Sequence, residues 1–224
     1  MTVQANFHDI KTQVEQSCKK IGRNKEDITI IAVTKYVTAE RAKEALDAGL
    51  CHLGENRLEG LLEKYEEIGN RATWHFIGSL QSRKVKDILP HVDYIHSLDR
   101  DSLAKEINKR ADRQVSCFVQ VNVSGEQSKH GLDPSQVVPF IEKLKTYPNI
   151  IVVGLMTMAP LVDNEEIVRK TFRQLKHIRD EVMDKQWAHA PCRYLSMGMS
   201  NDFHIAVEEG ATHIRIGTKL VGLN

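Results

Sequence analysis

The segment from Ile28 to Tyr36, ITIIAVTKY, is the part of the sequence that decides the fold. Read with strand periodicity, it has apolar residues on both faces, which is typical of a parallel strand covered on both sides in an α/β protein. The segment carries a single cation, Lys35. An ammonium group at the end of a buried strand is costly unless it is paired, neutralised or used chemically. A neutral lysine amine attacks aldehydes, although Lys35 could also simply extend into solvent.

Strand-like and helix-like segments alternate along the rest of the chain. Apolar, β-branched runs predict strands at 28–34, 51–54, 73–78, 92–95, 115–123, 151–156, 193–196 and 213–216. Helical spacing of apolar residues predicts helices at 7–20, 39–48, 57–68, 81–89, 101–111, 134–147, 164–185 and 201–210.

Regular strand–helix alternation predicts a parallel sheet, and eight such units in about 200 residues favour a (β/α)8 barrel of the TIM type. An open doubly wound sheet is the alternative. No linker or compositional break interrupts residues 1–224, so we predict one domain. The additional N-terminal helix, Phe7 to Lys20, is expected to cover one end of the barrel.

The composition is that of an ordinary globular chain. The 224 residues are 41% hydrophobic and 27% charged, with a net charge of +1, which argues against a nucleic-acid partner. Four scattered cysteines show no metal-binding spacing, so we expect reduced thiols and no metal site. Neither a signal peptide nor a membrane-spanning run is present, which predicts a cytoplasmic protein without a membrane partner. A monomer is the default expectation.

Active sites of such barrels lie at the carboxyl ends of the strands, and phosphate often binds after strands seven and eight. In the last strand, HIRIG, Ile214 and Ile216 face the helices, so Arg215 points into the barrel. A buried guanidinium must find an acceptor, either a carboxylate inside the barrel or a ligand.

The residues around Arg215 favour a phosphate-bearing ligand. Gly217 and Thr218 follow it directly, and Ser200 precedes the predicted helix that opens with Asn201 and Asp202. Glycine amides, hydroxyls and a helix N-terminus all suit phosphate, although Ser200 could equally be a plain N-cap. Asp202 is expected to point away along the helix.

Together these groups require a ligand with an aldehyde, a hydrogen-bond acceptor and a phosphate. Pyridoxal 5′-phosphate has all three. Its aldehyde would form an aldimine (Schiff base) with Lys35, its ring nitrogen would accept a hydrogen bond from Arg215, and its phosphate would lie over Ser200, Gly217 and Thr218.

Blocks of sequence throughout the chain carry a family resemblance. They are AVTKY (32–36), GEN (54–56), HFIGSLQ (75–81), SLD (97–99), VNVSGEQSKHG (121–131), GLMTMAP (154–160), LSMGMSNDF (195–203) and RIGTKLVG (215–222). With these blocks the sequence resembles the pyridoxal phosphate homeostasis proteins, single-domain relatives of the N-terminal barrel of alanine racemase, which belongs to fold type III of the pyridoxal phosphate proteins.

The resemblance implies that Lys35 holds the cofactor, that Arg215 meets its ring nitrogen, that Ser200, Gly217 and Thr218 bind its phosphate, and that Asn56 lies beside it. The chain departs from the family pattern at Arg83 and at Val221, where an asparagine and an aromatic residue are common. Both lie outside the expected cofactor contacts, so the expected cofactor site is unchanged. The two departures affect only what the resemblance implies for the rim of the cavity and for any partner surface there.

Other polar residues are expected to be packed or solvated and to have no role in the site. His52, His75, His96, His130 and His213 are dispersed in sequence, so we expect packed or solvated side chains, with His75 and His213 lining the barrel. Lys129 is expected in a solvated loop, and the role of Lys84 is open.

Three functions are compatible with these residues. The first, which the resemblance implies, is a non-enzymatic protein that holds pyridoxal phosphate and delivers it to apo-enzymes that need it. The second is a low-efficiency amino-acid racemase with Lys35 as one base and Tyr36 or water as the other. The third is a Schiff-base aldolase without a cofactor. Because the sequence ends soon after strand eight, it leaves no room for the further domain that supplies the second acid/base residue in alanine racemase, so we expect no established catalytic residue.

Overall fold

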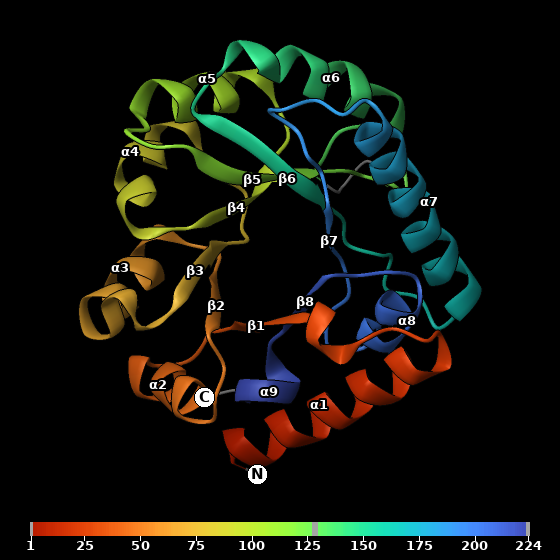
Figure 1. The fold of residues 1–224 in the computed structure, drawn as a ribbon. Coiled ribbons are helices and arrows are strands. Elements are labelled where there is room, and N and C mark those ends of the chain that lie inside the picture. The colour runs from red at the N-terminus through yellow and green to blue at the C-terminus, as the bar shows by residue number, and fades with distance from the viewer. Residues whose placement is uncertain (1, 127–129, 223–224) are drawn as a thin grey trace.

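The computed structural model describes residues 2–126 and 130–222. Its eight strands form one closed, parallel barrel in chain order, ringed by helices (Figure 1). The strands are β1 (Thr29–Val33), β2 (His52–Glu55), β3 (Thr73–Phe76), β4 (Tyr94–Leu98), β5 (Val115–Gln120), β6 (Ile150–Met156), β7 (Tyr194–Ser196) and β8 (His213–Ile216).

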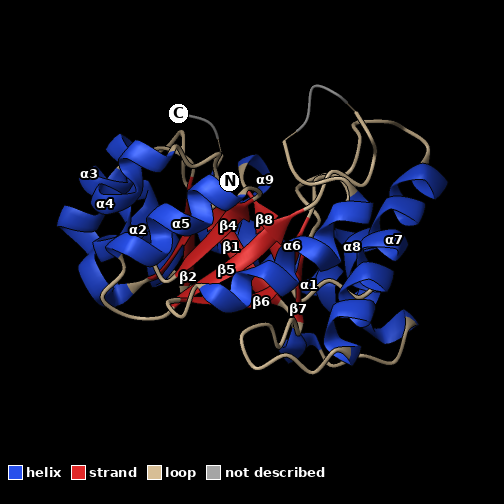
Figure 2. Cartoon of the chain, turned by 90° about the horizontal axis from the view of Figure 1, so that it is seen from above, coloured by secondary structure: helices blue, strands red, loops and turns tan. Residues whose placement is uncertain are grey.

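The predicted barrel is confirmed, and the open sheet is wrong. The last strand pairs with the first, with Ile30 opposite Ile214 and Ala32 opposite Ile216, so no sheet edge remains between β8 and β1. Figure 2 shows the strands gathered in the centre and the helices on either side of them.

Helices cover the outer face of the barrel. The α-helices are α1 (Val3–Lys20), α2 (Ala39–Asp47), α3 (Leu58–Ile68), α4 (Val85–Ile88), α5 (Asp101–Arg110), α6 (Val137–Lys143), α7 (Glu165–Asp184), α8 (Phe203–Glu208) and α9 (Thr218–Val221). The 3-10 helices are η1 (Lys25–Asp27), η2 (Gly69–Arg71), η3 (Ser82–Lys84), η4 (Leu89–His91), η5 (Pro134–Gln136) and η6 (Leu144–Thr146). In the described part of the chain, none of these combines the length and apolar character needed to cross a bilayer.

The observed helices differ in part from the predicted ones. The helix expected at 134–147 is divided into η5, α6 and η6. The helix expected at 81–89 is divided into η3, α4 and η4, and the last of these contains Pro90 near its start. Proline lacks the amide hydrogen that continues an α-helix. The short α9 was not expected, because four residues carry too little periodicity to be recognised.

The N-terminal helix lies in the outer ring instead of across a barrel end. Thr2 caps it by accepting the Ala5 amide hydrogen, and its buried stripe includes Ile10, Val14 and Cys18. α1 packs between α2 and α8 and also touches α9 (Figure 1). This position explains the amphipathic pattern, because only one face of α1 is covered.

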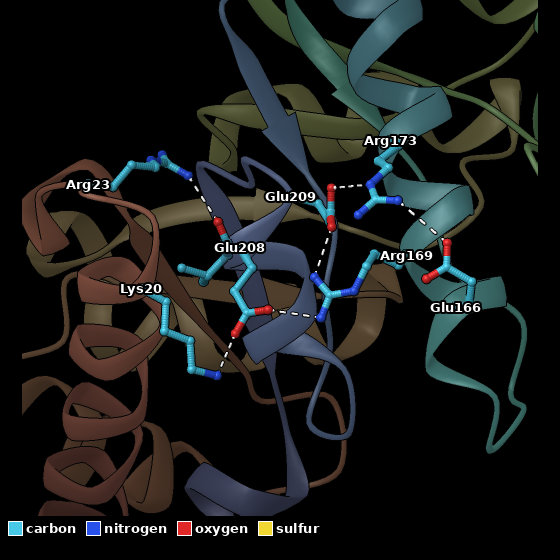
Figure 3. Close-up of polar contacts among 8 residues, drawn as sticks. Lys20, Arg23, Glu166, Arg169, Arg173, Glu208 and Glu209 are labelled. Atoms are coloured by element: carbon cyan, nitrogen blue, oxygen red, sulfur yellow. Dashed lines mark hydrogen bonds and ion pairs between the residues drawn. The ribbon is translucent and has the colours of Figure 1, made fainter.

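An ion network joins α1 and α7 to the end of α8 (Figure 3). Glu208 bonds Lys20 of α1 at 2.7 Å and Arg169 of α7 at 2.9 Å. Glu209 bonds Arg169 at 2.8 Å and Arg173 at 2.9 Å. Two adjacent carboxylates therefore fix α8, the helix that follows the predicted phosphate loop, against two longer helices.

Candidate functional site

A cavity of about 450 Å³ lies at the carboxyl ends of the strands. Its volume is in the range usual for small-molecule sites. All of the predicted cofactor-binding residues contribute to its wall: Lys35, Asn56, Ser200, Arg215, Gly217 and Thr218. The barrel thus brings together side chains that are up to 183 positions apart in the sequence (218 − 35).

Lys35 lies in the turn just beyond the last residue of β1 and is exposed. Its Nζ is 4.8 Å from the centre of the Tyr36 ring. The expectation of a lysine at the end of a covered strand is therefore wrong, because the Lys35 side chain is exposed. What singles out Lys35 is its position at the mouth of the cavity.

A buried ion pair lies behind the ends of β1 and β2. Glu55 and Lys64 are only 1% and 3% exposed, and their Oε1 and Nζ atoms are 3.2 Å apart. Thr34 donates its hydroxyl to the same Oε1 at 2.6 Å. Burial raises the pKa of Glu55, while the bonds from Thr34 and Lys64 oppose this shift. Since Thr34 precedes Lys35 and Glu55 precedes Asn56, the pair holds both site residues in place.

Replacing Lys64 with methionine is expected to destabilise the protein by about 3–5 kcal/mol, because Glu55 would remain as an unpaired buried carboxylate. Chemical denaturation measures this loss. The matched control is the double variant Lys64→Met/Glu55→Gln, which removes the charge as well and should recover most of the stability. Equal losses in the single and double variants would contradict this account.

Asn56 is held by close contact with the loop after β3. A Cβ atom added at Gly78 would lie 2.2 Å from the backbone oxygen of Asn56, so only glycine allows the two loops to approach this closely. The predicted proximity of Asn56 to the other site residues agrees with this packing, although its role toward a ligand stays a prediction.

Arg215 points into the barrel as predicted and is 5% exposed. Its Nη1 donates to the Ser196 hydroxyl at 2.6 Å and its Nη2 to the Thr157 carbonyl at 2.9 Å. Burial lowers the pKa of Arg215 to about 10, and the nearby Asp202 opposes this shift. In the chain as described, no carboxylate forms an ion pair with this guanidinium, so the internal salt bridge considered from the sequence is absent.

The loop between β7 and α8 differs in detail from the prediction. The helix begins at Phe203 and its N-cap position is Asp202, so Ser200 is not the N-cap. The Asp202 carboxylate accepts the Met199 amide hydrogen and Asp202 forms part of the cavity wall, so it does not point away along the helix. Gly198, with φ +93°, makes the turn, because an added Cβ would lie 2.5 Å from that of Ala206.

The histidines are dispersed in sequence but gather in space. His75, His96 and His213 are at most 5% exposed inside the barrel, and His52 lies next to His75 at the amino ends of the strands. His75 and His213 line the barrel as expected, and His52, His75 and His96 are in addition joined by hydrogen bonds. His130 lies at the cavity wall. The sequence signal that was missed is that His52, His75, His96 and His213 each occupy an inward position of a different strand.

Three residues outside the expected cofactor contacts remain. Lys84 pairs with Glu59 at 2.6 Å. Val221, the last residue of α9, is buried, so it is not part of an exposed rim. Lys129 lies outside the described residues. Within those residues, no group of three or more histidine, cysteine, aspartate or glutamate side chains is arranged to hold a metal ion.

Comparison with known proteins places this geometry in a family. The sequence pattern described as "Alanine racemase, N-terminal domain" matches residues 7–224. The pyridoxal phosphate homeostasis protein of Aquifex aeolicus is 42% identical over 214 residues, which cover 94% of this chain and 93% of the relative. The chain belongs to the pyridoxal phosphate homeostasis family. The resemblance drawn from the sequence blocks is thereby confirmed.

Solved structures related to this family have the same barrel. PipY of Synechococcus elongatus, with pyridoxal phosphate bound, superposes with a TM-score of 0.81 at 32% identity, covering 94% of this chain and 100% of PipY. Alanine racemase of Clostridium difficile has a TM-score of 0.78 at 18% identity and matches over 56% of its own length. At that identity the likeness concerns the fold alone.

Proposed function

We propose that this chain binds pyridoxal 5′-phosphate covalently through Lys35 and acts in its homeostasis as a holder of the cofactor. The observation that carries the proposal is the pairing of two groups in one cavity. These are an accessible amine, on Lys35, and a buried guanidinium without a carboxylate partner among the described residues, on Arg215.

The residues of the cavity fit the parts of this cofactor. The Lys35 Nζ would form a carbon–nitrogen double bond with the aldehyde carbon, and the aldehyde oxygen would leave as water. Asn56 would lie beside the ring. Ser200, Gly217 and Thr218 supply hydroxyl and backbone donors for the phosphate.

Arg215 favours holding over catalysis. A guanidinium can only donate hydrogen bonds, so it pairs with a ring nitrogen that carries no proton. When bound, the cofactor supplies an aldehyde and an electron-withdrawing ring, and an unprotonated ring withdraws electrons less strongly. The relatives also carry the name of homeostasis proteins. We therefore assign a binding role. The proposal extends to a monomer in the cytoplasm, with apo-enzymes as the recipients of the cofactor.

The racemase alternative rests on Tyr36, whose ring lies 4.8 Å from the Lys35 Nζ. Tyr36 is 62% exposed, so within residues 2–126 and 130–222 its hydroxyl is not enclosed opposite the lysine. Turnover of L-amino acids well above that of free pyridoxal phosphate, and abolished by Lys35→Ala, would favour the racemase over the holder.

Borohydride reduction followed by peptide mapping tests the proposal. Protein loaded with pyridoxal phosphate should show a visible absorption band. Borohydride should remove this band, because it reduces the carbon–nitrogen double bond to a single bond, and the same reduction makes the Lys35 linkage permanent. The modified peptide should then contain Lys35. Modification of Lys84 or Lys129 instead, or no visible band after loading, would contradict the assignment.

A further inference from the structure

A continuous line of hydrogen bonds crosses the barrel interior and ends on Arg215. The His52 Nδ1 lies 2.9 Å from the His75 Nε2, and the His75 Nδ1 lies 2.9 Å from the His96 Nε2. The His96 Nδ1 lies 2.9 Å from the Ser196 Oγ, which also accepts from Arg215. These side chains come from β2, β3, β4, β7 and β8.

The two ends of this line open at opposite ends of the barrel. His52 is half-buried and lies on the wall of a second cavity, at the amino ends of the strands, which we call the barrel floor. Thr29, the first residue of β1, lies on the same wall. Arg215 lies on the wall of the cofactor cavity. Between them, His75, His96 and Ser196 are completely buried. Water therefore does not compete for the hydrogen bonds in the middle of the line.

The number of protons on these side chains determines which atom donates in each hydrogen bond of the line. Burial lowers the pKa of His75 and of His96 well below the usual range, so each ring is neutral and has one N–H donor and one acceptor nitrogen. Arg215 can only donate, so the Ser196 Oγ accepts from it. In the described part of the structure the Ser196 proton has one acceptor within reach, the His96 Nδ1.

The direction of the Ser196–His96 bond then determines which nitrogen of each histidine carries the proton. With its Nδ1 accepting, His96 carries its proton on Nε2 and donates to the His75 Nδ1. His75 in turn carries its proton on Nε2 and donates to the His52 Nδ1. The reverse direction would leave the Ser196 proton without an acceptor in a fully buried position, which is costly.

We propose that His52, His75, His96 and Ser196 form a polarised hydrogen-bond wire that positions Arg215 and stabilises its charge in place of a carboxylate. Every member presents an acceptor toward Arg215 and a donor toward the barrel floor, so the dipoles add. The wire supplies this stabilisation without a negative charge near the ring nitrogen. The consequence for the cofactor rests on the function proposed above, whereas the direction of the wire does not.

Nitrogen NMR of the protein without cofactor tests the direction of the wire. In ¹⁵N-labelled protein, His52, His75 and His96 should each appear as the tautomer protonated on Nε2, with scalar coupling across the two N–H···N bonds. The variants His52→Phe, His75→Phe and His96→Phe assign the signals. Protonation of His75 or His96 on Nδ1, or a doubly protonated ring near neutral pH, would overturn the proposal.

Matched substitutions test the effect on Arg215. His96→Phe keeps the packing against Phe118, whose ring centre is 4.2 Å away, but removes the bond to Ser196. We expect it to weaken the binding of pyridoxal phosphate, measured by equilibrium dialysis, by roughly tenfold and to shift the visible band. His213→Phe is the control, since His213 contacts the same Phe118 ring but bonds Thr212 and not the wire. It should change binding by less than about twofold.

Ser196 offers a second comparison that alters very few atoms. Ser196→Ala should weaken binding as His96→Phe does, while Ser196→Thr keeps the hydroxyl and should retain most of the affinity. This pair carries the test if His96→Phe does not fold. Equal effects of His96→Phe and His213→Phe, or unchanged binding in Ser196→Ala, would overturn the positioning role. Absence of a visible band in the wild type would instead contradict the proposed function and leave the NMR result standing.

Discussion

Lys35→Ala is expected to abolish the visible absorption band of protein loaded with pyridoxal phosphate and to weaken retention of the cofactor on the order of a hundredfold. The proposed linkage needs an amine at the cavity mouth, and among the described residues Lys35 is the lysine on the cavity wall. Arg215 and the phosphate donors remain in the variant, so weak non-covalent binding should persist. Absorption spectroscopy and equilibrium dialysis measure the two effects.

Lys84→Ala is the matched control for this prediction. Lys84 is also partly exposed, but it pairs with Glu59 outside the cavity, so the band and the affinity should be unchanged. Because Lys35 is exposed, its replacement should also change the free energy of unfolding by no more than about 0.5 kcal/mol. A band that survives in Lys35→Ala, or disappears in Lys84→Ala, would place the linkage elsewhere.

Stability is expected to fall steeply as the pH drops from about 6.5 to 5, because the barrel interior holds neutral histidines. Burial lowers the pKa of His213 to about 3, and it lowers the pKa values of His75 and His96 well below the usual 6.5. In this pH window the unfolded chain binds a proton at each histidine and the folded chain does not. The unfolded state is therefore favoured as the pH falls, by about 1.4 kcal/mol per pH unit for each histidine.

The three histidines together give a slope of about 4 kcal/mol per pH unit, which is large beside a typical total stability of 5–15 kcal/mol. The pH range of this loss distinguishes the effect of the buried histidines from that of the surface carboxylates. Glu15, for example, has a pKa lowered to about 2 by Lys19 and Lys25, so its contribution is lost only below about pH 4.5.

Chemical denaturation at a series of pH values measures the slope. His213→Phe should reduce it by about 1.4 kcal/mol per pH unit, since one buried titrating ring is removed. His8→Gln is the control, because His8 is exposed on α1 and should leave the slope unchanged. A stability that stays flat between pH 7 and pH 5 would show that the interior histidines are protonated in the folded protein.

The alternation of strands and helices was predictable because it depends on neighbouring residues. Strand periodicity placed Arg215 on the inner face of β8, since Ile214 and Ile216 had to face the helices. The rule that sites lie at the carboxyl ends of barrel strands then grouped Lys35, Ser200 and Thr218, and the cavity wall contains all three. These inferences required only local patterns and a known architecture.

Other features depend on pairs that no local pattern connects. The Glu55–Lys64 ion pair could not be predicted, because Lys64 reads as one more polar residue on a surface helix. The sequence left both a covered and a solvated Lys35 open, because whether a strand end is covered depends on the loops that surround it. The histidines are dispersed along the sequence, and each alone suggests packing.

Local sequence patterns were enough to predict the parallel strand–helix alternation, the inward arginine and the group of residues at the cavity mouth, because periodicity and turn chemistry act over a few residues. The three-dimensional fold was needed to show that β8 closes on β1 and that His52, His75, His96 and Ser196 meet in a line behind Arg215. The pairing of β1 with β8 joins residues 184 positions apart (214 − 30), and the His96–Ser196 bond joins residues 100 positions apart. Both depend on the stagger of strands around the closed barrel.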